Sequence, residues 1–127
     1  MKEIRPEISF RLYAYDELSA EDQKLIEAAK KASYHSYAPY SHFSVGAAVL
    51  LDNEEVICGS NQENAAYPSG TCAERTTLFY ANSTFPEVGV KTLAIAARNE
   101  KGAFTTHATA PCGACRQVML ETQERSK

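Results

Sequence analysis

Apolar and polar residues alternate in a pattern that divides the first part of the chain into an extension and a helix. From Leu25 to Ala32 the apolar residues recur at the spacing of a helical face, which predicts a helix over about 20–34. Ser19 comes directly before it and is a typical N-cap, with acidic residues following in the first turn. Residues 1–19 as a whole lack clear periodicity, so we expect an N-terminal extension that packs on the outside.

Three short apolar runs predict strands. Residues 45–51 and 55–60 are separated by the turn residues Asp52 and Asn53, and we expect them to form a hairpin. Residues 91–97 form the third run. A β-sheet is therefore expected in the middle of the fold.

Two further helices are predicted over about 71–81 and 111–123, the second with Pro111 at its first helical position. The resulting order of helices and strands predicts an α/β fold, a three-layer α/β/α sandwich with a mixed sheet, in a single domain spanning 1–127. The last helix should return the chain to a further parallel strand, but the sequence stops at Lys127, within or just past that helix. We therefore expect the C-terminal strands of the sheet to be missing.

Composition and charge narrow the class of protein. The chain has 127 residues, of which 44% are hydrophobic, and a net charge of -3, as is typical of one globular domain. The acidic balance argues against a nucleic-acid partner, and no apolar run is long enough to span a membrane. The N-terminus lacks the apolar core of a signal peptide, so a cytoplasmic location is expected. In a reducing compartment, four cysteines favour metal binding or redox chemistry over a disulfide framework.

Three of the cysteines, Cys72, Cys112 and Cys115, fall at predicted helix N-termini. The free N–H groups and the helix dipole lower the pKa of a thiol there, and thiolates are the form that binds metal. Three thiolates give zinc three protein ligands and leave the fourth tetrahedral position open, which is the mark of a catalytic site. We expect one Zn²⁺ per subunit, with a bound water whose pKa is lowered to about 7 so that hydroxide is available.

Glu74 follows Cys72 by two residues, which on the first turn of a helix aims the carboxylate beside the metal. A carboxylate in that place can take a proton from the water and pass it to a substrate. Zinc with three thiolates is formally an anion, so the site needs compensating positive charge. Arg75 could donate a hydrogen bond to a ligand sulfur, and Arg116 could do likewise.

Other interpretations of these cysteines stay open. The pair at 112–115 could be a thioredoxin-like redox pair, which would leave Cys72 unexplained. A closed structural zinc site would need a fourth ligand, and the candidate is Cys58, whose position within an apolar strand favours a small buried side chain. A zinc-stabilised module without catalysis would have no need of Glu74. The histidines show no ligand spacing and are expected on the surface: His35, His42 and His107.

Four motifs, in order along the chain, resemble one known family. The run 72–74 reads Cys-Ala-Glu and is followed at 111–115 by Pro-Cys-x-x-Cys, the signature of the zinc deaminases. The runs 43–48, Phe-Ser-Val-Gly-Ala-Ala, and 61–66, Asn-Gln-Glu-Asn-Ala-Ala, are also similar to that family. Over about 20–123 the chain resembles the zinc-dependent cytidine and deoxycytidylate deaminases, in particular the homotetrameric type that acts on free nucleosides.

The resemblance implies an activity and an assembly. The reaction would be hydrolytic deamination of cytidine and deoxycytidine to uridine and deoxyuridine plus ammonia, through a zinc-bound hydroxide, as part of pyrimidine salvage. The assembly would be a homotetramer or a homodimer. Blasticidin-type nucleoside antibiotic deaminases share the cysteine pattern and remain an alternative. Family members also continue into further strands and a phenylalanine that completes a neighbouring subunit's site, and no residue here matches that part.

The resemblance also implies roles for individual residues in binding a nucleoside. Asn61 and Glu63 would form hydrogen bonds with the ribose hydroxyls, for which an amide and a carboxylate are chemically suited. Phe43 would pack against the pyrimidine ring. The backbone carbonyl of Ala73 would accept a hydrogen bond from the amino group that leaves, and Tyr67 would form part of the pocket wall.

Overall fold

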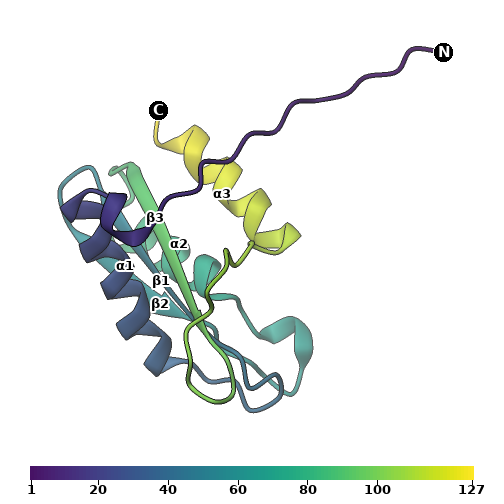
Figure 1. The fold of residues 1–127 in the computed structure, drawn as a ribbon. Helices are drawn as coiled ribbons and strands as arrows, with labels where there is room; N and C mark the ends of the chain where they lie inside the picture. Colours follow the sequence, from purple (N-terminus) through teal and green to yellow (C-terminus); the bar gives the residue numbers. More distant parts are fainter.

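A computed structural model describes residues 1–127 and has the predicted order of three helices and three strands (Figure 1). The helices are α1 (Ala20–Ala32), α2 (Ala73–Thr84) and α3 (Gly113–Arg125). The strands are β1 (Ser44–Leu51), β2 (Val56–Ser60) and β3 (Val90–Arg98). Short 3-10 turns η1, η2 and η3 occupy Tyr15–Glu17, Ser33–His35 and Tyr67–Ser69. None of the helices has both the length and the apolar character needed to cross a bilayer.

The sheet has the strand order β2-β1-β3, with β1 in the centre. The predicted hairpin of β1 and β2 is confirmed, and Ala48 of β1 lies opposite Cys58 on one side and Ala94 on the other. Both pairings are antiparallel. The parallel neighbour of a mixed sheet was expected after the last helix and is not among the strands of this chain.

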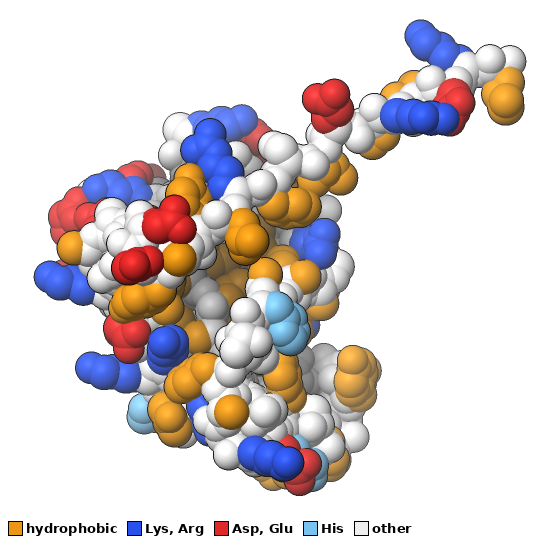
Figure 2. All heavy atoms as spheres, in the orientation of Figure 1, with side chains coloured by type: hydrophobic (Ala, Val, Ile, Leu, Met, Phe, Trp, Pro, Cys, Tyr) orange, Lys and Arg blue, Asp and Glu red, His pale blue; other side chains and the backbone are white.

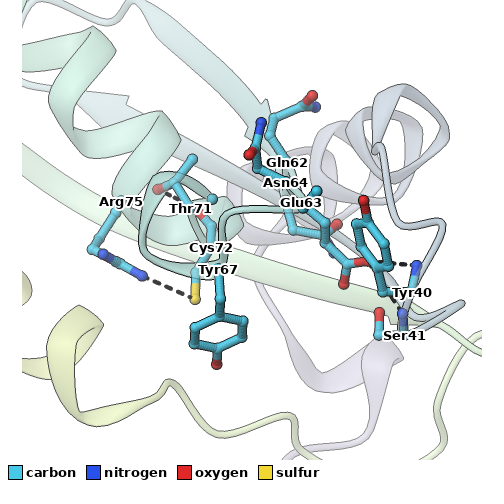
Figure 3. Close-up of a pocket in the computed structure, with 12 residues that line it drawn as sticks. Tyr40, Ser41, Gln62, Glu63, Asn64, Tyr67, Thr71, Cys72 and Arg75 are labelled. Atoms are coloured by element: carbon cyan, nitrogen blue, oxygen red, sulfur yellow. Dashed lines mark hydrogen bonds between the residues drawn. The ribbon is translucent and has the colours of Figure 1, made fainter.

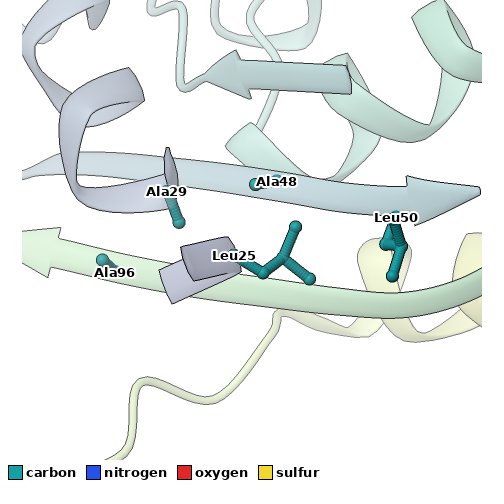
Figure 4. Packing of buried hydrophobic residues seen from close by; sticks show 5 residues of the cluster. All are labelled: Leu25, Ala29, Ala48, Leu50 and Ala96. Carbon is teal, nitrogen blue, oxygen red and sulfur yellow. The ribbon is translucent and has the colours of Figure 1, made fainter. Parts of the chain in front are cut away.

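Helices cover both faces of the sheet, which confirms the three-layer α/β/α arrangement. On one face Leu25 of α1 packs with Ala48 and Leu50 of β1 (Figure 4). On the other face Leu78 of α2 packs with Val49, and part of α3 lies against the same cluster. Because side chains alternate between the two faces of a strand, the continuous apolar run of β1 supplies both cores.

Gly46 allows α1 to lie close to the sheet. A Cβ atom at this position would lie 2.0 Å from the backbone oxygen of Ala29 and 2.5 Å from the backbone nitrogen of Ser33. No side chain can be accommodated at that distance, so the close packing of α1 on β1 depends on glycine.

The helix starts agree with the predictions to within two residues. The N-cap at Ser19 is confirmed, because its Oγ accepts a hydrogen bond from the backbone N–H of Asp22 over 3.1 Å. The other two helices begin later than expected, with Cys72 and Cys112 as their N-caps. Pro111 therefore precedes the cap and is not the first helical residue, because the sulfur of Cys112 takes the capping role.

The N-terminal segment leaves the body of the protein. Residues 1–14 contain no helix or strand and are all exposed. Figure 1 shows them running away from the sheet and helices. The expected packing on the outside is therefore wrong for these residues. Only the turn η1 is attached, where Tyr15 Oη donates a hydrogen bond to Glu27 of α1 over 3.1 Å.

Candidate metal centre and adjoining cavity

The N-termini of α2 and α3 bring three sulfur atoms together. Cys72 and Cys112 are the N-caps, and Cys115 lies in the first turn of α3 and is fully buried. Their sulfur atoms all lie within 4.8 Å of one another, and those of Cys72 and Cys112 are 3.6 Å apart. All four cysteines of the chain are free thiols. The predicted three-cysteine cluster is therefore present and reduced.

The geometry and the chemistry of this cluster fit zinc. Zn–S bonds of about 2.3 Å in a tetrahedron require sulfur atoms about 3.8 Å apart, close to the separation of Cys72 and Cys112. Thiolates are soft donors that suit zinc. No fourth histidine, cysteine or carboxylate residue belongs to the group, so one coordination position stays open to a water or a substrate.

Cys58, the candidate fourth ligand of a closed site, is not part of the cluster. It lies in the middle of β2 and is exposed, so the expectation of a buried side chain is wrong. The physical reason is its place in an edge strand, since α1 lies mainly over β1 and β3. The three histidines are exposed, as expected.

The surroundings of the two cysteines of α3 differ. The backbone N–H of Cys115 donates to the sulfur of Cys112 over 3.4 Å, and this hydrogen bond lowers the pKa of the Cys112 thiol. Burial raises the pKa of Cys115 to about 12. A bound metal ion is what would deprotonate a thiol in that environment.

Arg75 supplies positive charge to the cluster. Its Nη2 donates a hydrogen bond to the sulfur of Cys72 over 3.5 Å (Figure 3). Hydrogen bonds with Cys72 and Cys115 raise the pKa of Arg75 further above its ordinary value. Arg116, by contrast, is exposed, and its Nε donates to the backbone oxygen of Pro111 over 2.9 Å. The expected contact of Arg116 with a sulfur is therefore absent, because its side chain turns back over the start of α3.

Glu74 is the buried acidic residue of the site. It lies in the first turn of α2, and only 5% of its surface is exposed. Its charge is one of the causes that raise the pKa of Cys115, so the carboxylate lies near the sulfur atoms. No side chain or backbone group of the protein donates a hydrogen bond to this carboxylate. Its oxygens are therefore left free to bind a water molecule or a ligand.

A cavity of about 570 Å³ adjoins Cys72, a size suited to a small organic molecule (Figure 3). Among the residues that line it are Asn61, Glu63 and Tyr67, all three expected in a binding pocket. Sequence reasoning missed two further lining residues, Tyr40 and Ser41. Their backbone N–H groups donate to Glu63 Oε1 over 3.0 and 3.1 Å. Hydrogen bonds from Ser41 and Tyr40 hold the pKa of Glu63 below its ordinary value.

Asn61 connects the cavity to the start of β1. Its Oδ1 accepts from the backbone N–H of Val45 over 2.8 Å, and its Nδ2 donates to the backbone oxygen of Phe43 over 2.9 Å. These bonds use one lone pair and one hydrogen of the amide, and leave one of each free. The side chain is therefore held rigidly and still has capacity for a ligand.

Neither of the other two expected binding residues lines the cavity beside Cys72. The carbonyl oxygen of Ala73, which is fully buried, accepts a hydrogen bond from the hydroxyl of Thr77 over 2.7 Å. Phe43 lines a different hollow, of about 700 Å³, together with residues 103–110. Its ring is not among the side chains that line the cavity beside Cys72.

Comparison of the sequence with known proteins points to a single family. The family described as the cytidine and deoxycytidylate deaminase zinc-binding region matches residues 19–126. Cytidine deaminase from Halalkalibacterium halodurans is 48% identical over 99 residues, which are 78% of this chain and 70% of the relative. Cytidine deaminase from Sporosarcina psychrophila is 44% identical, over 78% of this chain and 68% of the relative.

Comparison with solved structures points to the same family as the sequence comparison. The crystal structure of cytidine deaminase from Burkholderia pseudomallei superposes with a TM-score of 0.72 and 42% identity, covering 84% of this chain and 79% of that one. The family match over residues 19–126 includes the helices that carry the three sulfur atoms and Glu74. The chain therefore belongs to the cytidine and deoxycytidylate deaminase family of zinc-dependent hydrolases.

Proposed function

We propose that the protein deaminates cytidine and deoxycytidine to uridine and deoxyuridine with release of ammonia, as a step of pyrimidine salvage. One observation carries the proposal: an open set of three sulfur atoms lies beside the buried Glu74, next to a cavity of about 570 Å³. The relatives that are named cytidine deaminase support it.

Cys72, Cys112 and Cys115 would hold the zinc ion. When bound, zinc supplies Lewis acidity, which makes a water molecule nucleophilic at neutral pH. Arg75 offsets the negative charge of the three thiolates through its hydrogen bond to Cys72. That compensation keeps the ion electrophilic, which the reaction requires.

Glu74 moves the protons. Its carboxylate accepts a proton from the attacking water and delivers it to N3 of the pyrimidine as the C4–O bond forms. The same carboxylate then takes the proton of the new C4 hydroxyl and passes it to the amino group at C4, so that breaking of the C4–N bond releases ammonia and leaves the C4 carbonyl of uridine. Because no group of the protein donates a hydrogen bond to Glu74, both carboxylate oxygens are available for these transfers.

The cavity would bind the nucleoside through polar groups. Glu63 has one oxygen engaged by Tyr40 and Ser41, which leaves the other for a ribose hydroxyl. Asn61 has a free hydrogen and a free lone pair for the same diol. The carbonyl of Ala73 would accept from the amino group. Contact of Phe43 with the pyrimidine requires its ring to turn out of the hollow beside residues 103–110.

The proposal extends to assembly and location. A homotetramer or homodimer follows from the resemblance, and sedimentation equilibrium would measure it. A cytoplasmic location suits four free thiols, since a reducing compartment keeps cysteines unpaired.

Glu74→Gln tests the mechanism. The zinc-loaded variant should keep its metal but turn over cytidine roughly 10² to 10⁴ times more slowly than the parent. Ultraviolet spectroscopy measures this turnover. Glu55→Gln removes an exposed carboxylate in the turn before β2 and is the matched control. Parent-like turnover by Glu74→Gln would contradict the role given to Glu74.

A substrate panel tests the specificity. Ammonia release should be fast with cytidine and deoxycytidine and slow with cytosine, which lacks the ribose that Asn61 and Glu63 bind. Faster release from blasticidin S than from cytidine would favour the antibiotic deaminases instead. No release from any of the four by the zinc-loaded protein would indicate a zinc-stabilised module without catalysis.

A further inference from the structure

A single turn, residues 38–43, lies between the groups that the proposed function assigns to the two ends of a nucleoside. Glu63, assigned to the ribose, accepts hydrogen bonds from the backbone N–H groups of Tyr40 and Ser41 on one oxygen (Figure 3). Phe43, assigned to the pyrimidine, follows Ser41 by two residues. Whatever fixes this turn therefore bears on both ends of the ligand.

Ser41 contacts both of these residues. Its backbone N–H donates to Glu63 Oε1 over 3.1 Å, and its Oγ accepts a hydrogen bond from the backbone N–H of Phe43 over 3.1 Å. A hydrogen bond from the side chain of Ser41 is also the largest of the causes that lower the pKa of Glu63. A hydroxyl can accept one hydrogen bond and donate another at the same time, so the two contacts of this side chain are compatible. Ser41 is thus a direct link between the carboxylate and the backbone of Phe43.

The backbone of Phe43 is held on both sides. Its N–H is bound by Ser41, and its carbonyl oxygen accepts a hydrogen bond from Asn61 Nδ2 over 2.9 Å. The oxygen of the same amide accepts from the backbone N–H of Val45, which fixes the start of β1. Because both peptide groups are fixed, the ring changes position by rotation about its side-chain bonds. We expect such a rotation to turn the ring from the hollow beside residues 103–110 toward the cavity, with no change in the backbone.

His42, between Ser41 and Phe43, has a backbone conformation that few residues adopt. Its φ is 56°, in the left-handed region, which is uncommon for residues other than glycine. Its side chain is exposed, and Figure 2 shows histidine side chains on the surface in the lower half of the view. Burial of the side chain therefore does not explain this conformation. The hydrogen bonds of the turn do, among them the one from the N–H of His42 to the oxygen of Ala38 over 3.0 Å.

A second serine close to the turn makes a comparable bond without touching either end of the site. Ser36 Oγ donates to Ser44 Oγ over 2.7 Å. Ser36 forms no hydrogen bond with Glu63 or with Phe43. Its hydroxyl therefore provides a matched control for that of Ser41.

Given the proposed function, on which this role rests, we propose that Ser41 is a positioning residue that ties the ribose-binding carboxylate of Glu63 to the backbone of Phe43. The two ends of a nucleoside are then bound cooperatively, because contact at the carboxylate steadies the turn from which the ring reaches the pyrimidine. Without the hydroxyl, the N–H of Phe43 loses its partner and this part of the turn loosens. Contact with the ribose and contact with the pyrimidine then become independent of each other.

Steady-state kinetics of the zinc-loaded full chain with cytidine tests this role. Ser41→Ala removes an exposed hydroxyl and keeps the backbone N–H that binds Glu63. It should raise KM by about tenfold and keep kcat within about twofold of the parent, because the hydroxyl contacts neither the sulfur atoms nor Glu74. Ser41→Thr, which keeps a hydroxyl, should restore the parent KM. Ser36→Ala should have the parent KM as well.

A double-mutant cycle tests whether Ser41 acts through Phe43. Phe43→Leu removes the ring that the turn positions and should itself raise KM. In that background, Ser41→Ala should raise KM further by less than about twofold, because the link has lost the group that it positions. Two independent contributions would instead multiply.

Two results would overturn the proposal. A parent-like KM in Ser41→Ala would show that the hydroxyl does not position the site. A further rise of KM in the double variant as large as that in Ser41→Ala alone would show that Phe43 is not involved. A parent protein that does not turn over cytidine would contradict the proposed function, and with it the role of Ser41. Normal turnover by the parent together with either of the two results contradicts only the role of Ser41.

Discussion

The guanidinium of Arg75 donates a hydrogen bond to the sulfur of Cys72 over 3.5 Å, one turn further along the same helix. The Nε atom of the same guanidinium is buried and has no hydrogen-bond partner. Because a guanidinium stays protonated in proteins, this contact places a permanent positive charge against the three thiols of the metal centre. Of the two arginines that the sequence suggested for this part, Arg75 contacts a sulfur and Arg116 does not.

Arg75→Gln should therefore weaken zinc binding by roughly 10- to 100-fold, as loss of a hydrogen bond to a metal ligand commonly does. Competition with a chromophoric chelator measures this. Arg116→Gln is the matched control, since that arginine is exposed and contacts only the carbonyl of Pro111, and it should bind zinc as the parent does. An equal loss in both variants would contradict a specific contribution of Arg75.

Cys115→Ser should reduce bound zinc to less than about a tenth of one equivalent and lower the melting temperature, because zinc binding and folding are coupled. Metal analysis and thermal melting give the two measurements. Cys58→Ser changes the cysteine that lies outside the cluster and should keep full zinc. Full occupancy in Cys115→Ser would mean that two thiolates suffice to hold the ion.

Gly46→Ala should destabilise the protein by about 3 kcal/mol or more, since overpacking against a backbone cannot be relieved by a side-chain rotation. The added methyl would lie 2.0 Å from the backbone oxygen of Ala29. Gly113→Ala, at the start of α3, meets nothing within 4 Å and should be neutral or slightly stabilising. Urea denaturation of both variants checks the difference, and a Gly46→Ala protein as stable as the parent would refute the close approach of α1.

The pH dependence of Glu63→Gln should follow the lowered pKa of Glu63. A carboxyl group whose pKa is lower in the folded protein stabilises it above the unfolded pKa, and this contribution is lost as the pH falls through the folded value. The parent should therefore melt at a higher temperature than Glu63→Gln at pH 7, and the difference should shrink below about pH 4. A difference that stays constant from pH 7 to pH 3 would show that the charge is not responsible.

Much of the fold was predictable from the spacing of apolar residues, because the residues that form the core recur at regular intervals along each helix and strand. The apolar run of β1 predicted a central strand, and Ser19 predicted the start of α1. The two later helices were predicted to begin two residues early. In both, a cysteine serves as the N-cap, and propensity rules do not favour cysteine there.

The candidate site was predictable where it depends on spacing along a helix. The contact between Cys72 and Arg75 was predictable because the two residues lie one helical turn apart. Residues whose position depends on long-range packing were not predictable: Cys58 is exposed because α1 lies mainly over other strands, and Arg116 turns toward the carbonyl of Pro111. The direction of the Phe43 ring depends on a loop sixty residues further along the chain, which local sequence cannot report.

The two halves of the metal centre come from positions 40 residues apart in the chain, Cys72 and Cys112. Of the residues of α3, only Cys115 and Thr122 are buried. A bound ion joining these sulfur atoms would therefore be a principal attachment of the last helix to the rest of the molecule. We therefore expect bound zinc to raise the resistance of this helix to proteolysis, in addition to its part in turnover.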